Sequence, residues 1–476
     1  MQGFKFDFRF LIILPIWIAS NLIWTTASQY DPTNYVISAS RFSYSSDFNL
    51  YAYFHSVGTG LLTGFAIWTK IPFGLMVATL LWFATCQVLE VFSKLVNPKV
   101  LVTLGILVAF FGSVPLLTTQ LYSDWSGYFV ASLLIRGFFQ LQKNDRSGIT
   151  LISVSILVGT LSRPEFLFIS LLIFLICVFA FFFRAHWQGL VKSAFLVVVF
   201  SFALQCGFLF LQTGFIGTSI PTSSQVLKIE NLILPHIVST EDTSIIRLKT
   251  ESMSKPLQSF SQELIRINGS DLFRVDLIPL QISTTLFSLY GQNPKEVANR
   301  ASNLSGDIAT PIYDMFSNGK NFLITDRKSV ALSSIQALPF TVNSVFFPSD
   351  LYAAWTCDDP LAQILLFNRI RWGDRCPYEE LAPVFRNISR AVSMVFLLLI
   401  LLSFPRFIKA NSISKLKLAA TAAVLLIAMR LLGFSLALGI YHSTSTRFLS
   451  WVAPCVLFFA VSFFLRGNEK INSRQV

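Results

Sequence analysis

The stretch QYDPTNYVISASRFSYSSDFNLYAYFHSVGTGLLTGFAIWTK, Gln29–Lys70, decides how the chain is threaded. It follows a first apolar segment and combines an apolar side with polar residues such as Asp31 and Asp47. A segment of this kind lies in the membrane interface. Its Leu50–Trp68 part is apolar enough to cross, but a crossing there would export the basic clusters that follow. We therefore predict that residues 28–70 form an interfacial or re-entrant first outer loop.

The composition places the chain among membrane proteins. Hydrophobic residues make up 53% and aromatic residues 14% of its 476 residues. Several apolar runs approach the roughly 20 residues that a bilayer-spanning helix needs. We predict an all-α polytopic protein with about ten transmembrane helices, at roughly 10–27, 71–93, 100–118, 124–141, 148–163, 165–184, 190–213, 390–406, 416–441 and 447–466.

The charge distribution predicts the orientation of these spans. The net charge is +12, yet the segment Gly214–Ser389 holds 15 Lys and Arg against 17 Asp and Glu. The basic excess therefore lies in the membrane portions, where it follows the positive-inside rule. This pattern argues against a nucleic-acid partner. We expect both termini to be cytoplasmic, and the high Phe content favours a bacterial inner membrane.

Three regions follow from this arrangement. Residues 1–213 form an N-terminal transmembrane module, and residues 390–476 form the C-terminal transmembrane helices. Residues 214–389 are too many for a connecting loop, and we predict an inserted extracytoplasmic domain of mixed or mostly helical structure. Cys357 and Cys376 lie in it. A pair of cysteines in an oxidising compartment favours a disulfide, and two free thiols are the alternative.

The sequence contains no phosphate loop, dinucleotide-binding turn, HExxH or paired-cysteine motif. Its distinctive segments instead lie at the predicted outer ends of spans. In order, they resemble the GT-C superfamily of polytopic glycosyltransferases, which use polyprenyl-phosphate sugar donors. The segments that carry this resemblance are Tyr30–Ala39, Phe54–Gly58, Ser123–Trp125, Gly159–Glu165 and Arg447–Pro454.

The resemblance implies a reaction at the extracytoplasmic face. A sugar would pass from the lipid-linked donor to a hydroxyl of a saccharide, lipid or protein acceptor, with inversion. Such a transfer needs a base near the acceptor hydroxyl. Asp31 is our candidate for the base, and a turn or helix-end acid is the alternative. Asp124 would orient the acceptor or bind a divalent metal cofactor, and an interaction with a helix dipole is the alternative.

The leaving lipid phosphate needs cations. Lys70, Arg163 and Arg447 are available at the predicted outer face and are candidates for binding the donor phosphate. Each has an alternative role, because it would equally bind lipid headgroups. Pairing with Asp47 or Glu165 is a further alternative.

Arg430 differs from these cations because it falls near the middle of the predicted span 416–441. A charge at that depth is costly and usually faces a cavity or a partner. It would line the lipid-phosphate groove or pair with a polar group such as Gln205 or Gln87. His55 and Tyr35 of the interfacial loop are candidates for contacts with the substrate.

Two other functions stay open. A flippase or other transporter of lipid-linked oligosaccharides would spread polar residues over several spans. The few intramembrane charges here favour the enzyme. A polymerase or ligase of envelope polysaccharide would share the donor, and it would place its arginines in the large outer segment, where Arg369, Arg371 and Arg375 are found.

Overall fold

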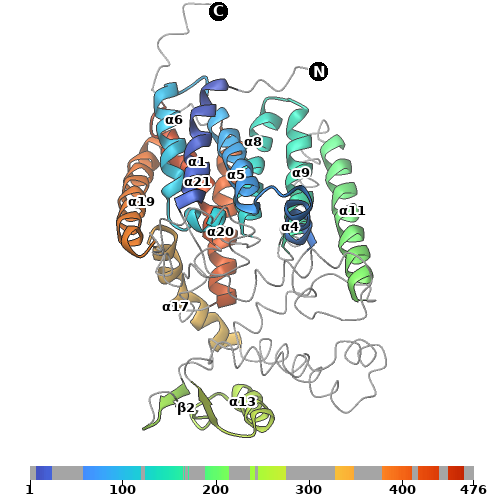
Figure 1. Ribbon diagram of the computed structural model, residues 1–476, viewed down its shortest axis with the longest axis vertical. Helices are drawn as coiled ribbons and strands as arrows, with labels where there is room; N and C mark the ends of the chain where they lie inside the picture. The colour runs from blue at the N-terminus through green and yellow to red at the C-terminus, as the bar shows by residue number, and fades with distance from the viewer. Residues whose placement is uncertain are drawn as a thin grey trace, which may run out of the picture.

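The computed structural model describes residues 7–23, 57–119, 124–163, 166, 170, 188–213, 236–241, 245–274, 327–347, 378–409, 416–438 and 449–465. This part of the chain is mostly helical (Figure 1). Its helices are η1 (Phe8–Ile13), α1 (Leu14–Ile23), α4 (Val57–Thr69), α5 (Phe73–Glu90), α6 (Pro98–Leu107), η2 (Val108–Phe110), α7 (Val114–Thr119), α8 (Trp125–Gln142), α9 (Ser147–Ser162), α11 (Gln188–Thr213), α13 (Lys255–Asn268), α17 (Arg327–Phe346), α19 (Tyr378–Lys409), α20 (Lys417–Leu438) and α21 (Val452–Ser462).

Several of these helices suit a membrane. Among the described residues, Phe73–Glu90, Gly189–Phe208 and Val384–Ser403 are long and apolar enough to cross a bilayer. Shorter apolar helices occupy the predicted spans 10–27, 100–118, 148–163 and 447–466. The chain is therefore a helical membrane protein. The number of ten spans stays a prediction. The predicted span 165–184 lies almost wholly outside the described residues.

The helix α4 belongs to the segment that decides the threading. Its 13 residues extend about 20 Å at 1.5 Å per residue, less than the roughly 30 Å of a hydrocarbon core. Its first turn lies against the end of α9: a Cβ added at Gly58 would be only 2.8 Å from the Leu161 carbonyl oxygen. Trp68 near its other end is 79% exposed. By itself α4 is thus too short to cross, and its interfacial position stays a prediction.

The predicted span 100–118 is not one continuous helix, which corrects the sequence reading. The helix breaks at residues 111–113, between η2 and α7, where Gly112 has a φ of +50°. The Gly112 amide donates to Ser393 Oγ at 3.1 Å, and its carbonyl accepts from Ser389 Oγ at 3.2 Å. A Cβ at Gly112 would also overlap the Val345 carbonyl oxygen. Glycine and the two serines of α19 make the break stable in an apolar environment.

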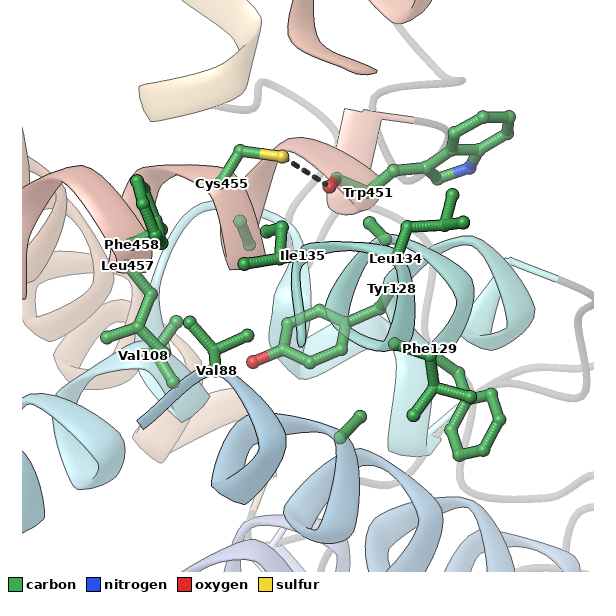
Figure 2. Close-up of a cluster of buried hydrophobic side chains, with 14 of the residues drawn as sticks. Val88, Val108, Tyr128, Phe129, Leu134, Ile135, Trp451, Cys455, Leu457 and Phe458 are labelled. Atoms are coloured by element: carbon green, nitrogen blue, oxygen red, sulfur yellow. Dashed lines mark hydrogen bonds between the residues drawn. The ribbon is translucent and has the colours of Figure 1, made fainter. Parts of the chain in front are cut away.

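Helix α8 runs through the centre of the bundle. Tyr128 is fully buried, and its hydroxyl shares a 2.8 Å hydrogen bond with Thr85 Oγ1 of α5. Trp17 of α1 meets the Tyr128 ring edge-on at 5.9 Å. Figure 2 shows Tyr128 pointing toward Val88, with Trp451 on the α21 side. Because α1 and α5 both contact this first turn of α8, the position where α8 begins is well defined.

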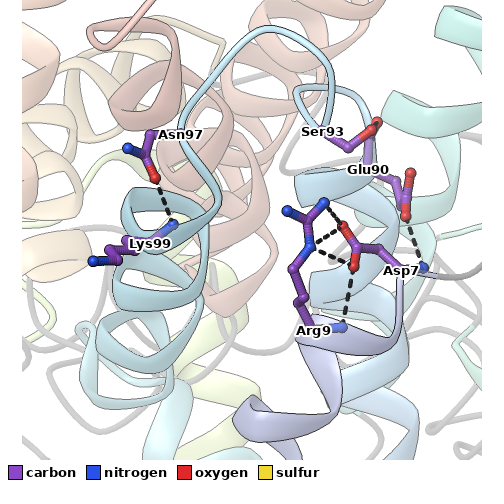
Figure 3. Close-up of polar contacts among 6 residues, drawn as sticks. All are labelled: Asp7, Arg9, Glu90, Ser93, Asn97 and Lys99. Atoms are coloured by element: carbon purple, nitrogen blue, oxygen red, sulfur yellow. Dashed lines mark hydrogen bonds and ion pairs between the residues drawn. The ribbon is translucent and has the colours of Figure 1, made fainter.

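Helix ends that the sequence assigns to the same side of the membrane contact each other. The Asp7 amide donates to Glu90 Oε1 at 3.2 Å, at the C-terminal end of α5 (Figure 3). The Leu418 amide donates to Gln142 Oε1 at 2.9 Å, so α20 begins beside the end of α8. All four residues belong to ends that the sequence assigns to the cytoplasmic side. Which side of the membrane they face stays a prediction.

A small sheet and one helix lie beyond the bundle (Figure 1). Strands β1 (Ile237–Ser239), β2 (Ile245–Leu248) and β3 (Leu272–Arg274) form an antiparallel sheet in the order β1-β2-β3. Ile237 pairs with Leu248, and Ile246 pairs with Phe273. Helix α13 lies between β2 and β3 in the sequence, so this described part of the predicted insert has mixed structure.

Other parts of the predicted insert pack on the membrane helices. Ser435 Oγ of α20 donates to Thr341 Oγ1 of α17 at 3.1 Å. Phe346 of α17 meets the Phe111 ring edge-on at 5.7 Å. Helix α19 runs without a break past residue 389, where we predicted the insert to end. The insert is thus attached to the bundle through α17 and α19, and its limits stay a prediction.

Candidate functional site

A buried ion pair joins the beginning of α8 to the end of α9. Asp124 immediately precedes α8 and Arg163 immediately follows α9, and they are 1% and 8% exposed. Arg163 Nη1 donates to Asp124 Oδ1. The two helices form a hairpin around residues 143–146, so these two ends come together. We call Asp124 and Arg163 the α8–α9 ion pair.

The local sequence explains the position of Arg163. Proline follows Arg163 in the sequence, and the residue before a proline is disfavoured in a helix, so α9 ends here. Arg163 accordingly has extended backbone, with φ −150° and ψ 134°. Asp124 makes no side-chain capping bond to α8. Its carboxylate accepts from the Arg163 guanidinium, a contact that was not among the roles predicted for Asp124.

A second unit surrounds Trp451, which lies just before α21 and is 2% exposed. The Phe166 ring stacks on its indole with centroids 4.4 Å apart and an interplanar angle of 16°. Arg430 Cζ of α20 lies 4.1 Å from the indole centroid. Two groups so close to one ring must cover its opposite faces. We call Phe166, Trp451 and Arg430 the Trp451 clamp.

Gly127 connects the clamp to the ion pair. A Cβ at Gly127 would overlap Cδ1 and Nε1 of Trp451, so only glycine lets the indole edge reach α8. Gly127 is three residues after Asp124, and residues at this spacing lie on the same face of a helix. The ion pair and the clamp are therefore neighbours, built from α8, α9, α20 and the start of α21.

Several buried polar atoms lie in the same segments. Trp125 Nε1, Ser450 Oγ and Trp451 Nε1 have no hydrogen-bond partner among the described residues. An unsatisfied buried donor costs about 1–3 kcal/mol, so native proteins keep few of them. Their concentration beside two buried arginines is typical of a site that a ligand or water completes.

The other predicted site residues fall elsewhere. Lys70 is exposed at the end of α4, with a φ of +57°. It is about 18 Å along the helix axis from Gly58, the residue that touches α9. Both amide atoms of Gln205 lack a hydrogen-bond partner in the described part of the chain, so the pairing of Arg430 with Gln205 is wrong. Asp31, Tyr35, His55, Arg447, Cys357 and Cys376 lie outside the described residues.

Sequence reasoning missed that Asp124 and Arg163 bind each other, because it gave them separate roles. The signal was present in their positions. Asp124 is 19 residues before Lys143, and Arg163 is 17 residues after Arg146, at matching distances from one hairpin loop. Trp451 was also missed as a site residue, although it lies within the Arg447–Pro454 segment that resembles the glycosyltransferases.

The described residues do not form a metal centre. They contain no group of three or more His, Cys, Asp or Glu residues that could hold an ion. The guanidinium beside Asp124 would repel a divalent cation, so Asp124 does not fit a metal ligand in this arrangement. A metal requirement that involves residues outside the described part stays a prediction, and no step below depends on one.

No protein-family model matches the chain, and no curated protein matches it. One solved structure to which the chain is similar is the archaeal oligosaccharyltransferase AglB from Archaeoglobus fulgidus, in complex with an inhibitory peptide and a dolichol-phosphate. The TM-score is 0.40 and the sequence identity is 13%. The likeness covers 96% of this chain and 50% of that one. A likeness of this degree does not by itself assign a fold or an activity.

Proposed function

We propose that this chain is an integral membrane glycosyltransferase. It transfers a sugar from a polyprenyl-phosphate-linked donor to an acceptor hydroxyl at the extracytoplasmic face. The observation that carries the proposal is the pair of buried guanidinium groups, Arg163 and Arg430, that four helices bring to one place. Charges buried in a membrane bundle usually mark function. The choice of reaction rests on the sequence segments that resemble GT-C glycosyltransferases and follow the same order along the chain.

The chemistry explains the need for arginine. Negative charge develops on the phosphate oxygen as its bond to the anomeric carbon breaks. A guanidinium already in place stabilises that charge without reorganisation, and more strongly than it would in water. Arginine also presents planar N–H donors that match two phosphate oxygens. A buried arginine is thus suited to the leaving lipid phosphate.

The acceptor side of the reaction depends on Asp31. A carboxylate takes the proton from the acceptor hydroxyl while the hydroxyl oxygen attacks the anomeric carbon on the face opposite the phosphate. The configuration at the anomeric carbon is thereby inverted, and the lipid phosphate is released. Asp31 lies outside the described residues, so this role rests on the motif resemblance. Asp124 acts on Arg163 rather than on the acceptor.

Release of lipid phosphate tests the proposal. The purified protein in lipid nanodiscs is given a panel of polyprenyl-phosphate sugars and saccharide, lipid and peptide acceptors. We expect release of polyprenyl phosphate from at least one donor. Asp31→Asn should abolish it, because removing a general base costs about 10²–10⁴-fold, while Asp7→Asn, away from the site, should keep the wild-type rate.

Two results would contradict this function. Turnover that survives Asp31→Asn shows that another group is the base. Movement of the lipid-linked sugar between the leaflets without release of lipid phosphate shows a transporter instead.

A further inference from the structure

We propose that Gln205 and Thr59 bind the hydroxyl groups of the donor sugar at the end of α9. This inference rests on the proposed function and makes it more specific. The two side chains are buried, at 3% and 0% exposure, and their polar atoms have no hydrogen-bond partner among the described residues. They belong to α11 and α4, which contact each other as well as α9 (Figure 1).

Gln205 faces the bundle rather than the lipid. The buried residues in the described part of α11 recur at spacings of four and seven, which places them on one face of the helix. They are Leu190, Ala194, Ser201 and Gln205. Large apolar side chains such as that of Phe200 are exposed elsewhere on α11. An amide buried among apolar side chains is costly unless its hydrogen bonds are made, so Gln205 needs a partner that the described chain does not supply.

The register of α9 and α11 gives the level of Gln205 along the bundle. Ser153 Oγ of α9 and Ser193 Oγ of α11 share a 2.7 Å hydrogen bond. A Cβ added at Gly189 would be 3.6 Å from Ile149 Cδ1, four residues earlier in both helices, so the two helices run in the same direction. Gln205 is 12 residues, or about 18 Å, beyond Ser193, whereas α9 ends about 14 Å beyond Ser153. Gln205 therefore lies level with the residues that directly follow α9, as does the α8–α9 ion pair.

Thr59 reaches the same level from α4. It follows Gly58, where an added Cβ would be 2.8 Å from the Leu161 carbonyl oxygen near the end of α9. Other buried threonines of the bundle, such as Thr63 and Thr85, donate to the carbonyl four residues before them. Thr59 is the third residue of α4, so no residue of its own helix lies four positions before it. Its hydroxyl therefore remains for a ligand.

The chemistry of the amide indicates a sugar rather than a phosphate. A glutamine amide has two donors on Nε2 and an acceptor, Oε1, side by side. An ionised phosphate only accepts hydrogen bonds, so it would leave Oε1 without a partner. Two neighbouring sugar hydroxyls both donate and accept, and they match both atoms of the amide. The donor sugar is bonded directly to its phosphate, so a sugar site level with Arg163 fits the proposed reaction.

The variant Gln205→Leu separates this role from a structural one. Leucine has a similar size without the amide. We expect the unfolding temperature to rise by about 1–3 °C, because an unsatisfied buried group is removed. The same variant should weaken binding of the sugar-bearing donor. A residue that only supports the fold would not change stability and donor affinity in opposite directions.

Binding of short donors measures the affinity. Farnesyl phosphate and its conjugates with glucose, mannose, galactose and arabinose are titrated by calorimetry into the whole chain in nanodiscs. We expect at least one conjugate to bind more tightly than farnesyl phosphate. Gln205→Leu should weaken that conjugate about 5- to 150-fold, the range for two hydrogen bonds, and Thr59→Val about 2- to 12-fold, the range for one. Neither variant should change the binding of farnesyl phosphate.

The variant Ser201→Ala is the matched control. Ser201 lies one turn before Gln205 on the same buried face of α11, but its hydroxyl already donates to the Val197 carbonyl at 2.7 Å. This variant should leave the affinity for every conjugate unchanged.

The outcomes separate the assignment from the function. The assignment fails if no conjugate binds more tightly than farnesyl phosphate, if Gln205→Leu keeps the wild-type preference or lowers the unfolding temperature, or if Ser201→Ala weakens binding as much. Each of these results would leave the proposed function standing wherever the wild type releases lipid phosphate. If the sugar preference depends on Gln205 in a protein that releases no lipid phosphate, the assignment stands and the proposed function fails.

Discussion

Two ion pairs with the same chemistry have different surroundings in this molecule. Asp7 precedes η1 and Arg9 lies in its first turn, where Arg9 Nε donates to Asp7 Oδ1 at 2.8 Å (Figure 3). The Arg9 side chain is 55% exposed. Asp124 and Arg163 are 39 residues apart and buried where α8 begins and α9 ends. One pair is a local contact at a partly exposed helix end, and the other joins two helices.

The difference shows which ion pairs affect the stability of the fold. An exposed pair is screened by salt, and most such pairs contribute little to stability. A buried pair is costly to assemble, and its value shows when one partner is lost, because the other is left charged in a poor solvent. Counting ion pairs would treat the two alike, whereas burial and separation along the chain distinguish them.

The strongest test of this comparison breaks the buried pair. Arg163→Gln should lower the free energy of unfolding by about 3–5 kcal/mol, because it leaves the Asp124 carboxylate buried without its guanidinium. Chemical unfolding in mixed micelles measures the loss. The double variant Asp124→Asn with Arg163→Gln should recover much of it. A loss below about 1 kcal/mol in Arg163→Gln would show that the pair behaves like an exposed one.

The next test concerns the packing beside the buried pair. Gly127→Ala should cost about 1–3 kcal/mol, because the new Cβ overlaps the Trp451 indole and must push α8 and α21 apart. Gly207→Ala is the matched control in another helix, since a Cβ there meets nothing within 4 Å. The unfolding temperatures of both variants check this. Equal unfolding temperatures of the two variants would mean that the Trp451 clamp rearranges without cost and does not pack rigidly beside the ion pair.

The smallest effect is expected at the exposed pair. Asp7→Asn should shift the unfolding temperature by less than about 2 °C, since asparagine still caps the helix and the lost pair faces water. Calorimetry in low and high salt checks this. A large shift that salt does not reduce would remove the contrast between the two pairs.

The same pair has a defined pH dependence. The hydrogen bond from Arg9 holds the pKa of Asp7 below its ordinary value of 3.8. A carboxylate with a lowered pKa in the folded state adds stability above the unfolded value and loses it as the pH falls through the folded value. The small difference between wild type and Asp7→Asn should therefore be complete at pH 5 and shrink below pH 3.8.

The sequence predicted the membrane helices well where the apolar surroundings alone determine which residue types are found. The spans 71–93 and 190–213 correspond to helices at Phe73–Glu90 and Gln188–Thr213. An apolar run of this length has few other stable conformations in a bilayer. The break at Gly112 was not predicted, because its stabilising serines are 277 and 281 residues further along the chain.

The candidate site was predicted in its parts but not in its assembly. Asp124 and Arg163 were selected as charges at the predicted outer face, in segments that resemble the GT-C glycosyltransferases, and Arg430 was selected because a charge within an apolar span is costly. Which charge met which partner depends on helix packing, so the pairing of the first two and the stacking of Arg430 on Trp451 were missed. Asp31 stays a prediction, and so does its meeting with these residues.

The break at Gly112 bears on how the protein is made. Its amide reaches its partner, Ser393, only after 281 further residues have been synthesised. At roughly 5 to 20 residues per second, that takes about 15 to 55 s. We expect the amide and carbonyl of Gly112 to be satisfied by water or by the insertion machinery during this interval, until Ser389 and Ser393 take over in the finished bundle.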